Sequence, residues 1–534
     1  MDPTKQPVVG TDPAANDITA EKKSSIPAVT DEEPVDLKHG ICIDQLDEAE
    51  IFLRDNGISH YHLHELLNNK ETQRKLVRRV DWTLLPLLAG TYLLQYVDKQ
   101  ALSYGAVFDL FDSTGISSNQ YSWLTSIFYF AYLVAEWPCS YVVQHYPASK
   151  IIGGFVVCWG CVMAATAACS NFTGLAICRF LLGCFEAVIT PAFMMIVSMW
   201  YIRDEQPFRA GVFYCMNGFG SMISGILFYG VGQAKGWDVW RIISIICGGL
   251  TIIWGVVLFC FLPSNILTAK GYTVEEKAML IARSQSNNIG VYSRKIRRSQ
   301  VKEALLDPQV WLLFLYVLLN ECINGGLASF GKLIVKGFTD DALLTVVYGI
   351  PYGAWLAFFI LTGPYCAGKF KNSRTWIMML WVCPTIIAMC LFWKLPRTNK
   401  NGLLMAYYIA PAFVGSLVVA LQMPSANLGG YTKRTTATAF VFLAYCIGNI
   451  IGPHAFLSSE APIYETGCKF IIGCGVAQMA CAFALRTLLV HRNKKRDAAT
   501  AAVGQTATTA DEAVMNEVIE DLTDFENPGF RYSY

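Results

Sequence analysis

The stretch WTLLPLLAGTYLLQYVDKQALSYG, residues 82–105, joins a long apolar run to two adjacent charges. Residues 82–97 carry no acidic or basic side chain, and Asp98 and Lys99 follow them directly. An apolar run of about 20 residues is long enough to cross a bilayer as a helix. Within such a helix an ionisable side chain is costly and by default indicates a functional site. The stretch therefore predicts a membrane helix that carries a functional pair of charges.

The composition of the whole chain indicates a membrane protein. Of its 534 residues, 54% are hydrophobic and 16% are charged, whereas soluble domains are roughly a quarter charged. The net charge is +1, and no basic stripe indicates a nucleic-acid partner. Because the first residues are polar and lack a cleavage site, we expect no signal peptide, and the first span would itself direct insertion.

Twelve apolar runs predict twelve membrane helices, arranged as six, a long polar segment and six more. In lipid every backbone group must be paired within its own segment, so each span is expected to be a helix. The predicted spans are residues 82–103, 121–143, 151–168, 175–201, 211–233, 241–261, 310–335, 343–367, 377–393, 403–423, 436–455 and 470–490. The expected fold is therefore an all-α membrane protein with two related six-helix halves.

Basic residues predict the orientation of these spans. They concentrate just before the first span, in the central polar segment and around the end of the last span. With an even number of spans these three places lie on one side, and the positive-inside rule makes that side cytoplasmic. The predicted domains are a cytosolic N-terminal tail at 1–79, a first half at 80–262, a cytosolic central loop at 263–309, a second half at 310–490 and a cytosolic C-terminal tail at 491–534.

The two tails are expected to be poorly ordered. Up to about Glu33 the N-terminal tail mixes proline with charged residues and lacks apolar periodicity, which is typical of disorder. After Asp497 the C-terminal tail is rich in alanine and threonine and then becomes acidic. We therefore expect the C-terminal tail to be mobile.

Neither the histidines nor the cysteines predict a metal site. His60, His62 and His64 alternate along an expected helix, so they face different sides of it. The 18 cysteines are scattered, mostly inside apolar runs, where a thiol behaves as a small buried apolar group. Since no Ser–His–acid set or metal-ligand cluster lies within the spans, we expect neither a metal nor an enzyme.

Two further charges lie in the fourth span, in the segment RFLLGCFEA, residues 179–187. Arg179 and Glu186 are seven residues apart, close to two helical turns, so they share one face. At about 1.5 Å per residue, Asp98 would lie roughly 8 Å and Arg179 about 9 Å inside the membrane. Asp98, Lys99 and Arg179 could therefore meet, with Glu186 two turns deeper.

This balanced set of two acids and two bases could couple proton entry to anion entry. Burial favours the neutral form of an acid and a neighbouring base favours its charged form, so such carboxyl groups can exchange protons. A substrate carboxylate beside Lys99 and Arg179 would compete with Asp98 and Glu186, and protonating these acids would free the bases. Two alternatives remain open: an ion-pair cluster that only fixes helix packing and, for Lys99 alone, a side chain that reaches out to the membrane surface.

Polar amides in the second half are further candidates for substrate binding. Asn320 and Asn324 are four residues apart in the seventh span, so they share a helix face. Gln422 and Asn449 lie in or beside the tenth and eleventh spans. Each of the four could bind a polar group of the substrate, or could equally form hydrogen bonds that hold helices together.

Four segments of the chain resemble the major facilitator superfamily, within it the anion:cation symporter group, and there the fungal allantoate permease family. The first is the opening stretch, similar to the first span of that family, where an acid and a base follow an aromatic-rich run. The second is RFLLGCFEAVITPAF, residues 179–193, similar to its fourth span. The others are WDVWRIISIICGGLT, residues 237–251, and DFENPGFRY, residues 524–532.

The resemblance implies the major facilitator fold, with twelve transmembrane helices in two six-helix halves and alternating access. It also implies roles for the four charges: Asp98 and Glu186 would bind protons, while Lys99 and Arg179 would bind the anionic group of the substrate. Bacterial members of the group have arginine where this chain has Lys99. Because lysine is a point charge without the bidentate fork of arginine, the carboxylate geometry is expected to differ there.

The resemblance further implies proton-coupled uptake of a small organic anion, such as allantoate, nicotinate or a related vitamin or nitrogen source. The proton gradient would be the driving force, with no cofactor. The chain would be a multi-pass protein of the plasma membrane, with both termini cytoplasmic, and we expect a monomer. Two other functions remain open: an efflux carrier for a fungal metabolite, and a nutrient sensor that does not transport.

Overall fold

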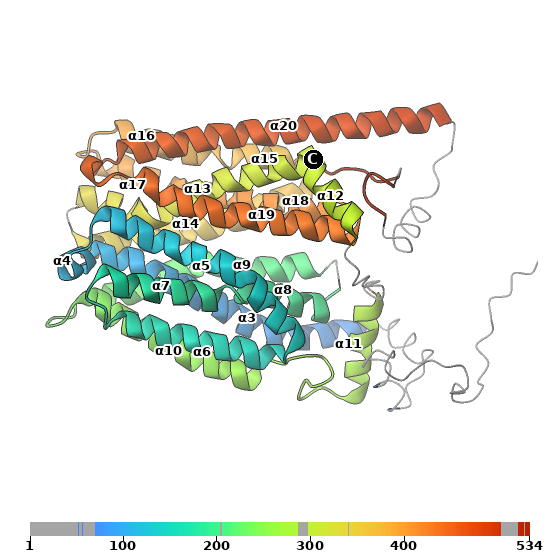
Figure 1. The fold of residues 1–534 in the computed structure, drawn as a ribbon, viewed down its shortest axis with the longest axis horizontal. Coiled ribbons are helices and arrows are strands. Elements are labelled where there is room, and N and C mark those ends of the chain that lie inside the picture. The colour runs from blue at the N-terminus through green and yellow to red at the C-terminus, as the bar shows by residue number, and fades with distance from the viewer. Residues whose placement is uncertain are drawn as a thin grey trace, which may run out of the picture. The chain divides into compact units, whose positions relative to one another are not determined.

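In the computed structural model, every regular element among the described residues is a helix (Figure 1). The structure describes Phe52, Asn56 and residues 70–202, 205–286, 297–339, 341–503, 522–527 and 529–534. The predicted helix with His60, His62 and His64, and the tail up to Glu33, lie outside the described residues. The following account concerns residues 70–534, which belong to one compact unit.

The first half consists of six helical rods, one of them in two pieces, and one short helix. The rods are α3 (Lys70–Val107), α5 (Ser118–His145), α6 (Ala148–Thr166), α7 (Phe172–Glu186) continued by α8 (Ile189–Trp200), α9 (Gln206–Val231) and α10 (Val239–Phe261); the short helix is α4 (Leu110–Thr114). Local signals begin some of these helices. Ser117 and Gln120 form a capping box at the start of α5, and the Asn171 side chain accepts a hydrogen bond from the Gly174 amide at the start of α7.

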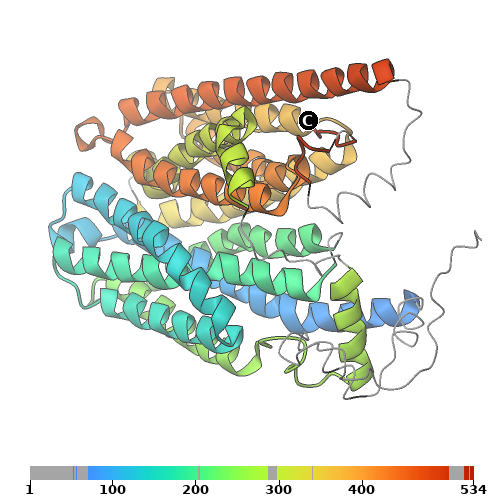
Figure 2. The same cartoon turned by 45° about the vertical axis from the view of Figure 1, so that its right-hand side comes forward.

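The second half repeats this arrangement after two polar helices, α11 (Val274–Ser286) and α12 (Arg298–Leu306). Its rods are α13 (Pro308–Thr339), α14 (Ala342–Lys369), α15 (Arg374–Leu380) continued by α16 (Cys383–Lys394), α17 (Lys400–Ile409) continued through η4 (Ala410–Ala412) by α18 (Phe413–Asn427), α19 (Tyr431–Ile451) continued by η5 (Gly452–Ala455), and α20 (Glu465–Val503); η6 (Ser458–Glu460) lies between the last two. Figures 1 and 2 show the rods of both halves running side by side.

Three predicted spans are interrupted in the structure, where continuous helices were expected. The fourth is divided between α7 and α8, the ninth between α15 and α16, and the tenth at η4. A proline follows each break, namely Pro191, Pro384 and Pro411. Because proline has no amide hydrogen, the carbonyl four residues earlier loses its helical partner, which weakens the helix there. Other prolines lie inside the continuous helices α3, α5, α14 and α18, so proline favours a break without dictating one.

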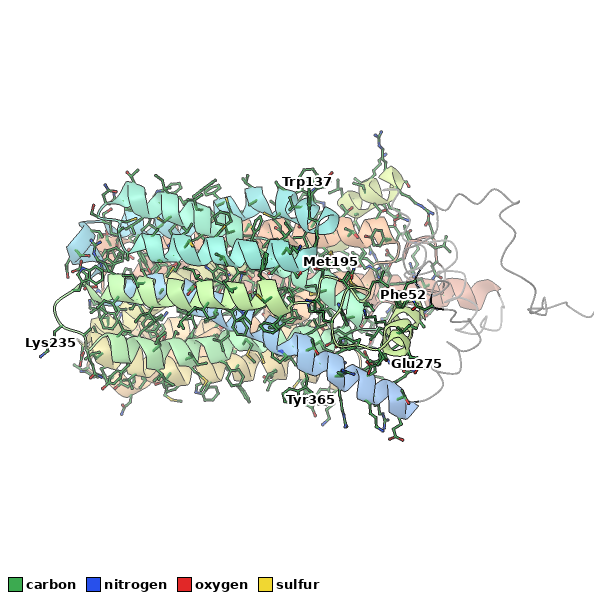
Figure 3. All side chains as sticks on the ribbon, turned by 90° about the horizontal axis from the view of Figure 1, so that it is seen from below. Phe52, Trp137, Met195, Lys235, Glu275 and Tyr365 are labelled. Atoms are coloured by element: carbon green, nitrogen blue, oxygen red, sulfur yellow. The ribbon has the colours of Figure 1, made fainter. Side chains whose placement is uncertain are left out.

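Ten of the predicted spans coincide with described helices that are long and apolar enough to cross a membrane. The first two spans lie on α3 and α5, of 38 and 28 residues, which are long enough but more polar. Large apolar side chains are exposed around the bundle: Trp137 is 80% and Tyr365 65% exposed, and they point away from it on opposite sides in Figure 3. Such extensive apolar exposure is expected of a surface that faces lipid.

The two halves meet mainly along three helix pairs: α9 with α14, α5 with α19, and α3 with α13. Glycines permit the closest of these approaches. A Cβ atom on Gly218 would lie 2.5 Å from the Cβ of Ala357, so only glycine fits there. The glycine-rich segment of α9 therefore serves close helix packing between the halves.

We call the end of the bundle that carries α4 the α4 end, and the opposite end, with α11, α12 and the last turns of α20, the tail end (Figure 1). Hydrogen bonds between the halves gather toward the α4 end. Tyr121 donates to the Ser329 carbonyl at 3.0 Å, and Ser126 donates to the Ile450 carbonyl at 2.9 Å. In the predicted orientation the tail end would face the cytoplasm.

The expectation of a mobile C-terminal tail is wrong for its last residues. Among residues 522–534, the Asp524 side chain is fully buried and lies 2.6 Å from Nζ of Lys433, which follows the start of α19. The Tyr532 amide donates to Asn493 Oδ1 at 3.0 Å, and the Ser533 amide donates to Asn427 Oδ1 at 2.6 Å. A few specific charges and amides therefore anchor this segment to the tail end, despite its polar composition.

Candidate functional site

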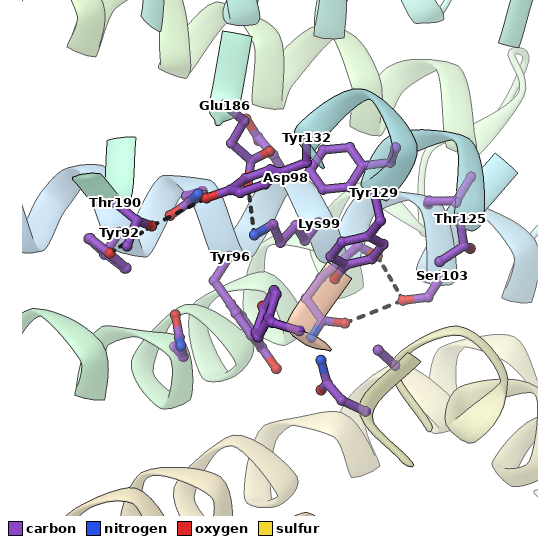
Figure 4. Close-up of a pocket in the computed structure, with 18 of the residues that line it drawn as sticks. Tyr92, Tyr96, Asp98, Lys99, Ser103, Thr125, Tyr129, Tyr132, Glu186 and Thr190 are labelled. Carbon is purple, nitrogen blue, oxygen red and sulfur yellow. Dashed lines mark hydrogen bonds and ion pairs between the residues drawn. The ribbon is translucent and has the colours of Figure 1, made fainter. Parts of the chain in front are cut away.

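A cavity of about 210 Å³ lies between the two halves, and both contribute to its wall (Figure 4). The first half supplies side chains from α3, α5, α6, α7, α8 and α9, and the second half from α13, α14, α18 and α19. Asp98, Lys99, Arg179 and Glu186 all line it. The four charged residues that the sequence singled out therefore share one cavity.

Lys99 and Glu186 form an ion pair across this cavity wall, between α3 and α7. The distance from Lys99 Nζ to Glu186 Oε1 is 2.8 Å, and the contact is drawn in Figure 4. The Glu186 side chain is 2% exposed, whereas that of Lys99 is 30% exposed. Glu186 is the last residue of α7, just before the break that precedes Pro191. The helix break thus ends α7 at the residue that faces Lys99.

Asp98 points to a different partner from its neighbour. It is buried, and its Oδ2 accepts a hydrogen bond from the Thr251 hydroxyl of α10 at 2.9 Å. Its Oδ1 is also buried and accepts no hydrogen bond within the part of the chain that the structure describes. A buried carboxyl group with one neutral donor is well suited to hold a proton, because an ionised group there lacks compensation.

Arg179 is a buried cation without a counter-ion among the residues that the structure describes. The residue is 6% exposed, and its Nε makes no hydrogen bond. No acidic side chain of the described residues lies within ion-pair distance of its guanidinium. Asp98 and Glu186 are near enough to act on it electrostatically. Its position on the wall leaves the guanidinium available to an anion in the cavity.

The structure therefore differs from the expected arrangement in its pairing. Helix geometry predicts Asp98, Lys99 and Arg179 at one depth, with Glu186 two turns deeper. In the structure Lys99 is bound to Glu186, and Asp98 and Arg179 each remain incompletely paired. One pair is thus neutralised, while one acid and one base remain available.

Aromatic side chains form much of the remaining wall. Tyr92 and Tyr132 both donate to the Thr190 hydroxyl, at 3.1 and 3.4 Å. Tyr129 lies beside Lys99 in the same view (Figure 4). Rings with hydroxyl groups combine apolar contact with a few polar contacts, a combination typical of small-molecule sites.

Of the four candidate amides in the second half, only Asn324 lines the cavity. Asn320 is fully buried and donates to the Phe413 carbonyl and the Ser416 hydroxyl of α18, each at 3.2 Å. Asn449 is also buried, and its amide donates to Glu321 and to the Tyr445 carbonyl. Gln422 lies outside the wall. For Asn320 and Asn449 the contacts match the helix-joining alternative.

Two ionisable residues of the seventh predicted span were missed. Glu321 is fully buried, and its Oε2 accepts hydrogen bonds from Asn449 at 2.7 Å and Asn324 at 3.0 Å, while its Oε1 has no partner in the described residues. Lys332 is 6% exposed and lies two turns beyond Asn324. The signal that identified Asp98 could have found both, because each is a charge inside an apolar run.

Comparisons with known proteins agree on one family. The family model for the Major Facilitator Superfamily matches residues 88–453. An uncharacterized transporter of Schizosaccharomyces pombe is 36% identical, over 86% of this chain and 87% of its own. The allantoate permease of Saccharomyces cerevisiae is 32% identical, over 87% of each chain. The solved D-xylose-proton symporter has a TM-score of 0.57 at 12% identity, over 76% of this chain and 97% of its own, and shares the fold.

Proposed function

This chain belongs to the major facilitator superfamily, and we propose that it imports a small organic anion together with protons across the plasma membrane. The protein is a multi-pass membrane transporter rather than an enzyme. The observation that carries the proposal is the buried guanidinium of Arg179 at the wall of a cavity between the halves, where no described residue supplies it with a counter-ion. A carboxylate is one of the groups that such a fork can bind with two parallel hydrogen bonds.

Asp98 would control the charge that the anion meets. With Asp98 ionised, the field of Arg179 is partly compensated. A proton on Asp98 removes that compensation and leaves a net positive wall, so that proton and anion favour each other's binding. Asp98 Oδ1 supports this role as a proton acceptor. It accepts no hydrogen bond from the described residues, so a proton can bind there without breaking one.

The Lys99–Glu186 pair would supply a second step. Protonating Glu186 would break the 2.8 Å ion pair and release Lys99 to the anion. Loss of that proton from Glu186 would restore the ion pair with Lys99 and expel the anion. Both halves contribute to the cavity wall, so a rocking motion of one half against the other would expose the site to either side of the membrane.

The relationship to the allantoate permease of Saccharomyces cerevisiae supports a carboxylate as the substrate. The first experiment is uptake of labelled carboxylates by cells that produce the chain, at acidic and neutral external pH, with Glu186→Gln alongside. We expect acid-stimulated uptake of one anion and its loss in the variant. Protein at the cell surface that takes up none of the acids would overturn import and favour an efflux carrier or a sensor.

A further inference from the structure

Lys332 occupies a small side pocket of about 30 Å³ that adjoins the main cavity. Gln100, Asn324 and Ala328 line both spaces, so the two are neighbours that share a wall. Asn324, Ala328 and Lys332 follow one another at intervals of four residues on α13, which places them on one face. Because Ala328 is small, the face leaves room between the amide and the ammonium group.

The protein surrounds this ammonium group with neutral acceptors only. Lys332 Nζ donates to Gln100 Oε1 and, at 2.6 Å, to the Ser103 hydroxyl, both on α3 of the other half. The ring centroid of Tyr104 lies 4.0 Å from Nζ. Within the described residues, no carboxylate lies within ion-pair distance of it. Burial without a counter-charge favours the neutral form of an amine, and an anionic ligand beside Lys332 would favour the charged form and pair with it.

The cavity and its side pocket therefore contain two buried basic groups, one in each half, that have no counter-ion among the described residues. Arg179 lies on α7 and Lys332 on α13. Lys99, the third cation, is already paired with Glu186. A ligand with a single carboxylate could compensate only one of the two.

We propose that Lys332 binds a second anionic group, and that the transported substrate is a small dianion held between Arg179 and Lys332. The proposal rests on the proposed function, since it takes Arg179 as the first anion site. It makes Lys332 a specificity-determining residue, which distinguishes dicarboxylates from monocarboxylates of the same shape. The amide of Asn324 would line the path between the two charges.

The test compares acids that differ only in the second charge. The full-length protein in lipid nanodiscs is titrated at pH 7 with succinate, glutarate and adipate, and with the monoamide of each. The readout is the ratio of the two affinities for each length, measured by intrinsic tryptophan fluorescence. For at least one length we expect the diacid to bind about tenfold more tightly, which corresponds to about 1.4 kcal/mol.

The variants Lys332→Met and Lys332→Gln should bring this ratio close to one. Lys336→Met, one turn further along α13 and outside the pocket, should leave the ratio as in the wild type. The Gln variant keeps a polar group in the pocket, so it serves if the Met variant does not fold.

Three results would overturn the proposal: a ratio near one in the wild type, a ratio that survives both Lys332 variants, or no binding of any diacid. The last result leaves the proposed function standing if labelled monocarboxylates are still taken up with acid stimulation. Loss of uptake of every carboxylate would instead overturn the proposed function itself.

Discussion

Lys433 and Arg179 are both buried cations, yet their surroundings differ completely. Nζ of Lys433 lies 2.6 Å from Asp524, 2.9 Å from Glu303 and 3.3 Å from Asp307. Arg179 has no ion pair among the described residues and keeps a bare Nε. The protein thus satisfies one charge fully at the tail end and leaves the other incomplete at the cavity.

The tail-end network joins several elements that are distant in sequence. Arg492 of α20 lies 2.7 Å from Asp307, and Tyr532 donates to Asp524 at 2.7 Å. Burial, reinforced by the nearby Asp524 carboxylate, raises the pKa of Tyr532 well above its ordinary value, so the hydroxyl stays a donor. Buried charges that are paired and hydrogen-bonded hold a structure together, whereas an unpaired one is available to a ligand.

The largest effect is expected at Lys433. Lys433→Met leaves Asp524 and Glu303 without this cation and Asp307 with Arg492 alone, and breaking a buried pair typically costs about 3–5 kcal/mol in free energy of unfolding. The unfolding temperature of the purified protein should fall clearly. The matched control is Lys469→Met, whose partner Glu465 is half exposed, where a surface pair contributes about 1 kcal/mol or less. Equal unfolding temperatures of Lys433→Met and Lys469→Met would contradict the interpretation that the buried Lys433 network stabilises the fold.

The next effect is expected at Arg179, in transport rather than in stability. Arg179→Ala removes the proposed anion site, and truncating one member of a buried charge interaction costs about 2–5 kcal/mol of binding free energy. Uptake of the anion at low concentration should fall at least thirtyfold. Arg179→Lys keeps the charge but loses the fork, so it should be intermediate. Unchanged anion uptake by the Ala variant at normal surface levels would remove Arg179 from the site.

A smaller effect is expected from Asp98→Asn, which imitates the protonated acid. In the wild type, uptake should rise as external pH falls, by at most about tenfold per pH unit for each proton required. In the variant the rise should flatten, and accumulation against a gradient should fail while exchange of labelled for unlabelled anion continues. Counterflow assays in liposomes separate the two. If both Asp98→Asn and Glu186→Gln still accumulate the anion, the protons bind elsewhere.

The sequence predicts much of this fold because lipid imposes a simple rule on it. Long apolar runs located ten spans that the structure describes as apolar helices. Prolines alone do not locate the breaks, because α3, α5, α14 and α18 each contain proline and remain continuous. The docking of residues 522–534 could not be predicted from composition. It depends on a few contacts, such as that of Asp524 with Lys433, which form only once the helices are in place.

The candidate site was predictable in its members but not in its pairing. Charges inside apolar runs identified Asp98, Lys99, Arg179 and Glu186, and the structure places all four at one cavity. Which acid faces which base depends on the rotation and tilt of α3 against α7. Tertiary packing sets both, so the local sequence does not reveal them. Asn320 and Asn324 show the same limit: they share a helix face by spacing, yet only Asn324 reaches the cavity.

The smallest effect is expected at Asn320, which tests whether a buried polar group away from the cavity is structural. Asn320→Ala removes two neutral hydrogen bonds to α18, at Phe413 and Ser416. Such bonds between membrane helices contribute about 0.6 kcal/mol each, so the unfolding temperature should fall slightly. Uptake per molecule at the surface should stay near the wild-type value.

The matched variant is Asn324→Ala, whose side chain lines the cavity. It should reduce uptake with a similar change in stability, because its loss alters the wall that the substrate contacts. A larger transport defect in Asn320→Ala than in Asn324→Ala would show that the cavity lining does not separate binding residues from packing residues.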